Sequence, residues 1–432
     1  MERAHKYTLI AVFLLIIFGV PIAQAIYEVT DDERPFFIEL FTQAPSEKNL
    51  RDFETQLEEA SIFEQGIRPR YQYLEYVTTR HMGIKALRGG DDWYFYTPGV
   101  KYLAEYYYSD PRGVPLTDGA DPIEVIADFK AQLEAKGIEL LVVPIPGKAS
   151  VYPDKLSSAG GKRGPVYTHT KRFVEELTKR GVDVLFMHDH LIEARAAADK
   201  AGRALYMKGD THWTGAGAKV AAKALAHSIR TRPWYVEATG KRYERVPIKV
   251  MRRGDVPKMT QIPKQEELFK EEEVEVFQIK DLQTGELYAD DRSSPVLLLG
   301  DSFSRVFHTD EPKSAGVIAN LAYELQQPIA TIVNDGGAST LVRQQLARDL
   351  ELLVGKRLVI WEFIERDIRF GMRGWQELQL FPEGWEPPQP EPAPESQPET
   401  EPAARPGADS APTSAPAVEG AAAATQAVGD PS

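Results

Sequence analysis

The sequence predicts a three-layer α/β fold, with a central, mainly parallel β-sheet between two layers of helices. Short apolar runs alternate with amphipathic helical segments between residues 121 and 381, which is the pattern of successive βαβ units. Most of these runs are continuously apolar, which indicates strands buried on both faces. We expect a membrane helix before this domain and a disordered tail after it.

The first element is an uncharged stretch at residues 7–27. About 20 apolar residues suffice to span the hydrocarbon core of a bilayer. Arg3 and Lys6 precede the stretch and acidic residues follow it, so the positive-inside rule places the N-terminus in the cytoplasm and the rest outside. Residues 1–30 therefore predict a signal anchor. Ala23-Gln24-Ala25 resembles a cleavage site, so a removed signal peptide is the alternative.

Residues 31–120 predict a juxtamembrane region of helices followed by an aromatic segment. Apolar residues recur at near-helical spacing between residues 50 and 63, and Ser46 is suited to cap that helix. The segment GGDDWYFYTPGVKYL, residues 89–103, opens with two glycines and predicts a short strand and turn.

The α/β domain is expected at residues 121–381. Its predicted strands are 138–145, 182–187, 295–299, 329–333 and 357–363, and its predicted helices are 122–136, 167–180, 216–230 and 341–353. Residues 232–294 interrupt this alternation with shorter strand-like patterns. The Gln283-Thr284-Gly285 turn within them predicts a hairpin, inserted near the rim of the sheet.

Composition excludes several classes of function. The chain has a net charge of −13, but nine acidic residues against one arginine lie in residues 382–432. That Pro/Glu/Ala-rich segment has too little apolar surface to fold, and we expect it to be disordered. No basic patch with interleaved aromatics stands out, which argues against nucleic acid as a partner. The absence of cysteine excludes disulfides, thiol catalysis and cysteine-ligated metals.

The first candidate catalytic residue is Ser302, in LLLGDSFSRVF at residues 297–307. It follows a predicted buried strand through Gly300 and opens a predicted helix. A serine at such a turn exposes its hydroxyl at the carboxyl edge of the sheet, as a nucleophile requires. The alternative is that Ser302 only caps the helix.

The second candidate is the pair Asp210 and His212, in KGDTHWTGAGA at residues 208–218. A histidine serves as a general base when a carboxylate holds its ring in the correct tautomer. The alternatives are a structurally bonded histidine, with Asp210 at a helix start, or a metal site. The metal site is disfavoured because no second histidine or carboxylate pair has helpful spacing, although His188 and His190 could add ligands after the second strand. We expect neither a metal nor a cofactor.

A third candidate is the turn NDGG, residues 334–337. Backbone N–H groups of Gly336 or Gly337 are suited to an oxyanion hole, which requires preorganised donors. The alternative is a simple strand-to-helix turn. Together, the three candidates can converge at one edge of one sheet.

These blocks resemble the SGNH/GDSL hydrolase superfamily. In its usual order the GDS block comes first, whereas here Asp210 and His212 precede Ser302 by about 90 residues. This permuted order is similar to the alginate O-acetyltransferase family, AlgJ and AlgX, with its D-x-H-W motif. Further similar stretches are WYFYTPGVKYL (93–103), VVPIPGKASVYPDKL (142–156), YMKGDTHWTGAGA (206–218) and VIWEFIERDI (359–368). The predicted anchor and the lack of a second folded domain resemble AlgJ more closely.

The resemblance implies a Ser302–His212–Asp210 triad that forms an acetyl-serine and transfers the acetyl group to an exported polysaccharide, alginate or another exopolysaccharide. It implies that the donor arrives through a membrane-bound O-acyltransferase, and that the catalytic domain lies in the periplasm, held at the cytoplasmic membrane. The family's oxyanion asparagine has no counterpart in IWEFIERDI, where Arg366 is the expected substrate contact.

The aromatic residues have two possible roles. Trp213 is expected either to brace His212 or to face the substrate, and Trp93, Tyr94 and Tyr96 either to stack on sugar rings or to pack in the core. The same residues also suit an acetylesterase of this fold. A polysaccharide-binding scaffold without activity is a third possibility, disfavoured by the presence of all three triad residue types.

Overall fold

The computed structural model describes residues 2–30, 61–104 and 119–385, except 165, 167 and 371–373, with isolated positions at 38, 46, 49, 50 and 53. The expected helix near residues 46–63 lies mostly outside the described residues. Most of the expected tail, residues 386–432, also lies outside them.

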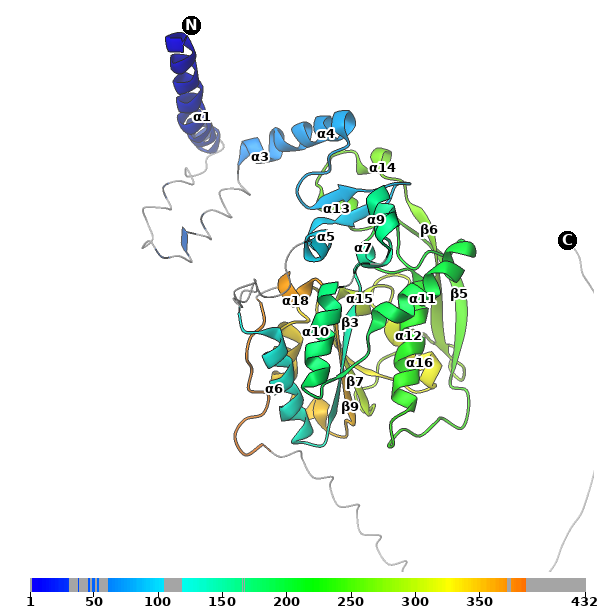
Figure 1. Ribbon diagram of the computed structural model, residues 1–432. Coiled ribbons are helices and arrows are strands. Elements are labelled where there is room, and N and C mark those ends of the chain that lie inside the picture. The colour runs from blue at the N-terminus through cyan, green and yellow to red at the C-terminus, as the bar shows by residue number, and fades with distance from the viewer. Residues whose placement is uncertain are drawn as a thin grey trace, which may run out of the picture. The chain divides into compact units, whose positions relative to one another are not determined.

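A five-stranded parallel sheet forms the centre of the α/β domain (Figure 1). The strand order is β4-β3-β9-β7-β8, and every neighbouring pair is parallel. The strands are β3 (Glu139–Ile145), β4 (Asp183–Val184), β7 (Val296–Gly300), β8 (Ala330–Val333) and β9 (Leu358–Ile364). All five were predicted within a few residues. β9 lies in the middle although it is last in the chain, so segments far apart in sequence meet at its carboxyl end.

Helices cover both faces of the sheet, which confirms the predicted three layers. On β3, Leu140 and Val142 face one hydrophobic core, and Leu141 and Val143 face the other. The first core includes residues of α6 (Pro122–Glu134), α10 (Thr168–Lys179) and α17 (Leu341–Arg348), and the second includes residues of α11 (Met187–Lys200), α12 (Gly215–Arg230) and α16 (Val317–Leu325). Strands buried from both sides explain why their sequences are almost continuously apolar.

The remaining elements are short or lie before the sheet. They are α1 (Glu2–Thr30), α3 (Ile62–Gly66), α4 (Arg68–Thr79), α5 (Thr97–Ala104), α7 (Lys148–Val151), α8 (Pro153–Leu156), α9 (Ser158–Arg163), α13 (Val256–Met259), α14 (Gln265–Leu268), α15 (Ser302–Arg305), a 3-10 helix (Leu350–Leu353) and α18 (Asp367–Phe370). Within α1, His5–Thr30 is long and apolar enough to cross a membrane. A signal sequence near the N-terminus has the same length and composition.

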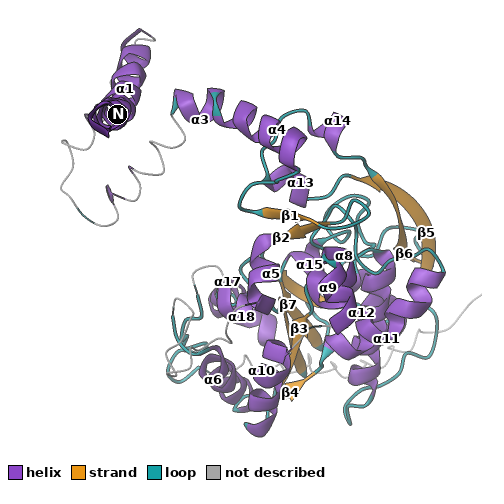
Figure 2. Ribbon diagram, turned by 45° about the horizontal axis from the view of Figure 1, so that its top comes forward, coloured by secondary structure: helices purple, strands orange, loops and turns teal. Residues whose placement is uncertain are grey.

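The inserted segment differs from its predicted form. β5 (Tyr243–Arg252) pairs antiparallel with β6 (Glu272–Asp281) along their full length, and α13 and α14 lie between them in the chain (Figure 2). The predicted turn after β6 is present, closed by the Asp281 N–H donating to the Glu286 carbonyl at 2.9 Å. Across this turn, the expected hairpin is reduced to a single antiparallel bridge between Lys280 and Leu287. The apolar alternation of β5 matches that of β6, for example Ile248 opposite Val276, so the two longer strands pair.

The aromatic segment packs with the α/β domain. β1 (Ala86–Arg88) and β2 (Tyr94–Tyr96) form an antiparallel pair. One short strand, β2, was expected in residues 89–103, but β1 precedes that range and the expected turn after β2 is helix α5. Trp93 and Phe95 belong to the same hydrophobic core as one face of the central sheet. The core therefore begins before residue 121, where the composition alone placed a boundary.

Candidate active site

Ser302 lies directly after β7, at the first position of α15. A Cβ on Gly300 would lie 2.5 Å from the Ser304 Oγ and 2.8 Å from a Glu362 carboxyl oxygen, so only glycine fits this approach. The buried Asp301 carboxylate accepts from the N–H of Phe303 at 2.8 Å and of Ile364 at 2.9 Å. The Gly-Asp pair thus holds the start of α15 against β9, and Ser302 remains partly exposed at the carboxyl edge of the sheet.

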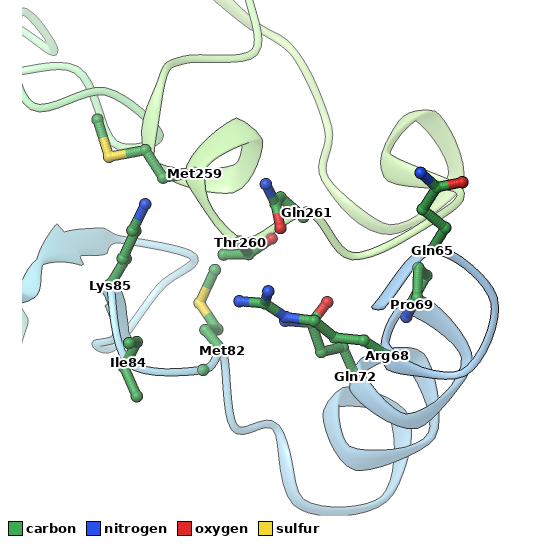
Figure 3. A pocket seen from close by; sticks show the side chains of 11 residues that line it. Gln65, Arg68, Pro69, Gln72, Met82, Ile84, Lys85, Met259, Thr260 and Gln261 are labelled. Atoms are coloured by element: carbon green, nitrogen blue, oxygen red, sulfur yellow. The ribbon is translucent and has the colours of Figure 1, made fainter. Parts of the chain in front are cut away.

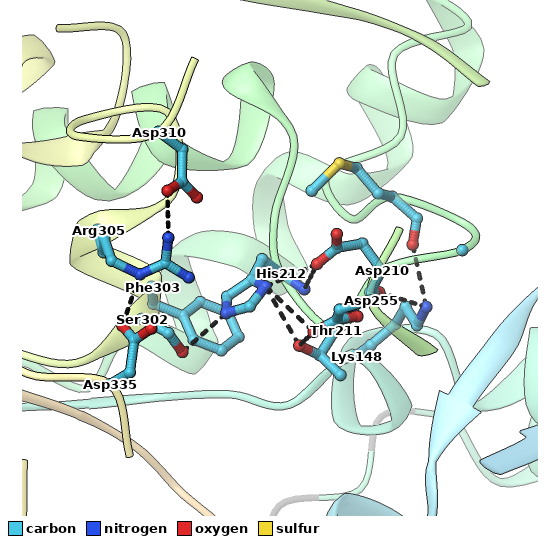
Figure 4. A network of polar contacts seen from close by, with 12 residues as sticks. Lys148, Asp210, Thr211, His212, Asp255, Ser302, Phe303, Arg305, Asp310 and Asp335 are labelled. Carbon is cyan, nitrogen blue, oxygen red and sulfur yellow. Dashed lines mark hydrogen bonds and ion pairs between the residues drawn. The ribbon is translucent and has the colours of Figure 1, made fainter. Parts of the chain in front are cut away.

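Ser302, His212 and Asp210 form one hydrogen-bonded chain (Figure 4). The Ser302 Oγ lies 2.8 Å from His212 Nε2, and His212 Nδ1 lies 2.6 Å from Asp210 Oδ1. The backbone N–H of His212 also donates to Asp210 Oδ1, at 3.1 Å. With Nδ1 donating to the carboxylate, Nε2 is free to accept the serine proton. The 90 residues between His212 and Ser302 are bridged because both lie at the same edge of the sheet.

Asp255 is a second carboxylate beside His212, and sequence reasoning missed it. Its Oδ2 lies 3.6 Å from His212 Nδ1, and it accepts from the Thr211 N–H at 2.7 Å and the Thr211 hydroxyl at 2.6 Å. Gly254 has φ +90°, and a Cβ there would lie 2.1 Å from the Gly209 carbonyl oxygen. The inserted segment therefore forms part of the site. The Gly-Asp dipeptide occurs at 209–210, 254–255 and 300–301, but also at 90–91 and 429–430, so by itself it did not single out Asp255.

Lys148 holds the loop that carries Asp210. Its buried ammonium donates to the carbonyl oxygens of Met207 at 3.0 Å, Lys208 at 2.9 Å and Asp210 at 2.6 Å. The rings of Trp93 and Phe95 lie 5.7 Å and 5.2 Å from the same ammonium. Burial lowers the pKa of Lys148 to about 8, against the opposing charges of Asp255 and Asp210. The group is therefore mainly protonated at pH 7, with all three of its hydrogens bonded.

We expect Lys148→Met to lower the free energy of unfolding by roughly 3 kcal/mol, because three buried carbonyl groups lose a charged donor. Chemical denaturation measures this change. The control is Lys179→Met, which removes an exposed lysine paired with Glu176 and should leave the unfolding midpoint unchanged. Equal midpoints for both variants would contradict the structural role of Lys148.

Electrostatics favour an imidazolium at His212. Burial lowers the pKa of His212, but the hydrogen bond and charge of Asp210 outweigh it, with a further upward contribution from Asp255 and a downward one from Arg366. The net pKa of His212 is above its usual value. Burial raises the pKa of Asp210, yet its bonds to His212 hold that pKa well below the usual range. The pair is thus arranged as a carboxylate that stabilises a protonated ring.

A cleft of about 580 Å³ opens beside this chain of residues. Asp210, His212 and Asp255 line one part of it, and Arg252 and Arg305 another. Arg305 bonds to Asp310 and, at 2.6 Å, to Asp335 in the NDGG turn. Asp210, His212 and Asp255 each place one potential ligand atom close enough to the others to hold a cation. However, His212 Nδ1 already bonds Asp210, and His212 Nε2 bonds Ser302.

The glycine turn lies beside the loop of Ser302. The Asn334 N–H donates to the Gly300 carbonyl at 3.0 Å, directly before the Asp-Ser pair. Gly336 has φ +63°, as the third residue of a turn in which the Gly337 N–H donates to the Asn334 carbonyl at 3.1 Å. The Gly337 N–H is therefore used inside the turn, and the oxyanion role of the Gly336 N–H stays a prediction.

The aromatic residues lie in the core for the most part. Trp213 is fully buried and packs edge-on against Phe303 at 5.1 Å, so it does not face a substrate in this structure. It supports Phe303, whose ring lies 4.8 Å from that of His212. Trp93 and Tyr94 are also buried. Tyr96 is partly exposed, which distinguishes it from the rest.

Arg366 follows β9 directly and lies at the carboxyl edge of the sheet. Its guanidinium lies 5.2 Å from the centre of the Tyr96 ring. The preceding Glu365 is buried and accepts from the Gly147 N–H at 2.6 Å, from Thr170 at 2.5 Å and from Ser150. Its other contact is His188, at 2.7 Å. Glu365 thus fixes the end of β9. Arg366 is partly exposed, and its charge acts on His212, whose pKa it lowers.

A parallel α/β sheet with a serine–histidine–aspartate chain at its carboxyl edge defines a serine-hydrolase-like protein. Residues 86–365 match the family described as SGNH hydrolase-like domain, acetyltransferase AlgX. The chain belongs to this family.

Individual relatives share only 25–28% sequence identity with this chain. "Probable alginate O-acetylase AlgJ" of Pseudomonas putida is 25% identical over 283 residues, covering 61% of this chain and 68% of the relative. Its namesake in Pseudomonas fluorescens is 28% identical over 137 residues, covering 31% of this chain and 34% of the relative. This match therefore spans about a third of the P. fluorescens protein.

A solved structure supports the fold. The O-acetyltransferase domain of P. putida AlgJ superposes with a TM-score of 0.51 at 21% identity, covering 66% of this chain and 92% of that domain. At this identity the likeness establishes a shared architecture.

Proposed function

We propose that this protein is an O-acetyltransferase that moves an acetyl group, through an acetyl-serine at Ser302, onto hydroxyls of an exported polysaccharide. The observation that carries the proposal is the continuous chain from the Ser302 hydroxyl through His212 to Asp210. Family membership supports acetyl transfer, and the names of the AlgJ relatives support alginate or a similar exopolysaccharide as the acceptor.

In the first half-reaction, His212 Nε2 takes the Ser302 proton while Oγ attacks the carbonyl carbon of an acetyl ester. The tetrahedral intermediate collapses as the bond to the donor oxygen breaks. The imidazolium then gives its proton to that oxygen, leaving acetyl-Ser302. Asp210 stabilises the positive ring throughout.

In the second half-reaction, a sugar hydroxyl gives its proton to His212 and attacks the acetyl carbon. The bond to Ser302 Oγ breaks, and the serine recovers the proton from His212. The Ser302 N–H and the Gly336 N–H supply oxyanion donors in both halves. Arg366 contacts the acceptor. It lies just after β9, where this chain lacks the family's oxyanion asparagine.

The proposed location is the cytoplasmic membrane, with α1 as a single-pass anchor and the catalytic domain in the periplasm. The uncharged span and the basic residues before it support this orientation. The acetyl donor then comes from a membrane-bound O-acyltransferase partner.

The transferase and esterase functions are separated by product analysis. Full-length protein in detergent is incubated with 4-nitrophenyl acetate and oligomannuronate, and the sugar is analysed by mass spectrometry. We expect acetylated oligosaccharide that is absent without enzyme. Release of acetate at the same rate with and without sugar, and no acetylated sugar, would support the esterase instead.

We expect Asp255→Asn to reduce kcat/KM by roughly tenfold and to move the acidic limb of its pH profile to lower pH. Burial lowers the pKa of His212, Asp210 raises it, and the charge of Asp255 raises it further. Removing the charge of Asp255 therefore lets the ring lose its proton at lower pH. Asparagine retains an acceptor for the Thr211 N–H.

The matched control is Asp183→Asn, at the amino end of β4, where the carboxylate pairs with Arg232. This variant should keep the wild-type pH profile. A profile of Asp255→Asn that coincides with that of Asp183→Asn would show that Asp255 does not act through His212.

A further inference from the structure

α4 presents an apolar face away from the domain. On its inner side, Tyr76 is buried and its ring lies 5.1 Å from that of Phe269. On its outer side, four large apolar residues are 43–61% exposed. They are Ile67, Tyr71, Leu74 and Val77. Their spacing of four, three and three residues places them on one helical face. The helix therefore offers apolar surface on both sides, and only one side is used by the domain.

This exposure is concentrated in one place. Among residues 61–104 and the described part of 119–385, ten large apolar side chains are exposed, and four of them are the residues of this one face of α4. Figures 1 and 2 show α4 at the edge of the domain, near α13 and α14. Contiguous apolar surface of this kind marks an interaction site.

The same edge is positively charged in an acidic protein. Residues 65–85 contain four basic side chains, Arg68, Arg70, Arg80 and Lys85, against the single acidic Glu75. Arg68 and Lys85 line a cavity of about 730 Å³ on the inner side of α4 (Figure 3). Arg70 is exposed and lies three residues after Ile67, on the outer face of α4. An apolar stripe beside a basic side chain suits a helix that lies in the surface of an anionic bilayer.

We propose that α4 is an interfacial helix that inserts its outer face into the headgroup region of an anionic phospholipid bilayer. The proposal rests on α1 being a membrane anchor. The 31 residues that join α1 to α3 can extend to about 100 Å, so α4 can reach the bilayer that holds α1. Tyr76 shares a small hydrophobic cluster with Val256, the neighbour of Asp255. Docking through α4 would thus hold the cleft near the membrane from which a donor arrives.

The chain has no cysteine, so a single introduced cysteine carries a unique spin label. Full-length Leu74→Cys is reconstituted in phosphatidylethanolamine/phosphatidylglycerol vesicles, and its accessibility to oxygen and to a nickel chelate is measured. Val236→Cys, at a 75% exposed site on the domain, is the matched control. Leu15→Cys, within α1, reports on the anchor itself.

We expect the ratio of oxygen to nickel accessibility to be several-fold higher at residue 74 than at residue 236. It should fall in phosphatidylcholine vesicles and in an added Arg70→Glu variant. Equal ratios at 74 and 236, with Leu15→Cys in the bilayer, would overturn the interfacial helix while leaving the anchor intact. A water-exposed label at 15 would overturn the anchor as well. If the label at residue 74 is shielded from the nickel chelate only after membrane proteins are added, the outer face of α4 binds a protein partner, and the lipid assignment is overturned.

Discussion

Replacing Ser302 with alanine is expected to reduce acetyl transfer by at least about 10³-fold, because the transferred group loses its covalent carrier. The fold should be retained. Asp301, whose carboxylate caps α15 and bonds the Ile364 N–H, is unchanged in this variant, and the missing hydroxyl lies at a partly exposed position. The measurement is the initial rate of sugar acetylation, with thermal unfolding recorded on the same sample.

Ser293→Ala is the matched control, since it removes an exposed serine in the loop before β7. It should leave the acetylation rate unchanged. A Ser302→Ala enzyme that acetylates sugar at the rate of Ser293→Ala would exclude the acetyl-serine.

The second large effect is expected for Asp210→Asn, which should lower kcat by roughly 10²- to 10⁴-fold. The amide can no longer stabilise the imidazolium, and it can donate to Nδ1, which favours the wrong tautomer. Burial lowers the pKa of His212 and Asp210 raises it, so losing the carboxylate should lower this pKa. A general base is active when neutral. The acidic limb of the pH profile, set by the raised pKa of His212 in the wild type, should therefore move to lower pH.

The pH profile of the residual activity checks this result, with Asp183→Asn again as the control. Asp255→Asn should shift the limb in the same direction with a smaller loss of rate, because its carboxylate is 3.6 Å from Nδ1 while that of Asp210 is 2.6 Å away. A wild-type rate for Asp210→Asn, or a limb moved to higher pH, would contradict the assigned role.

The strands of the sheet were predictable because a strand that is buried on both faces is apolar at nearly every position. Leu140 and Leu141 face opposite cores, and both must be apolar, so β3 stands out as a continuous run. Ser302 and His212 could be named as candidates because each follows a strand or precedes a helix in a recognisable motif. Their contact at 2.8 Å was expected only from the family resemblance, because a separation of 90 residues leaves no local pattern and the contact depends on the strand order.

Other features depend on contacts that leave no local pattern. Asp255 reaches His212 only because β5 and β6 pair and Gly254 packs against Gly209. Trp213 has the composition of a sugar platform, yet it is buried against Phe303. The aromatic segment before the sheet likewise surrounds the ammonium of Lys148. An aromatic residue suits either role, and its burial decides between them.

The central claim is that Ser302 carries the acetyl group, and intact-protein mass spectrometry after rapid mixing with 4-nitrophenyl acetate tests it most directly. We predict an adduct of ~42 Da, the mass of one acetyl group replacing a proton, that maps to the peptide containing Ser302 and disappears when oligosaccharide is added. The adduct should be absent in Ser302→Ala. An acetylated sugar product without any adduct at Ser302, or an adduct that persists in Ser302→Ala, would contradict the account.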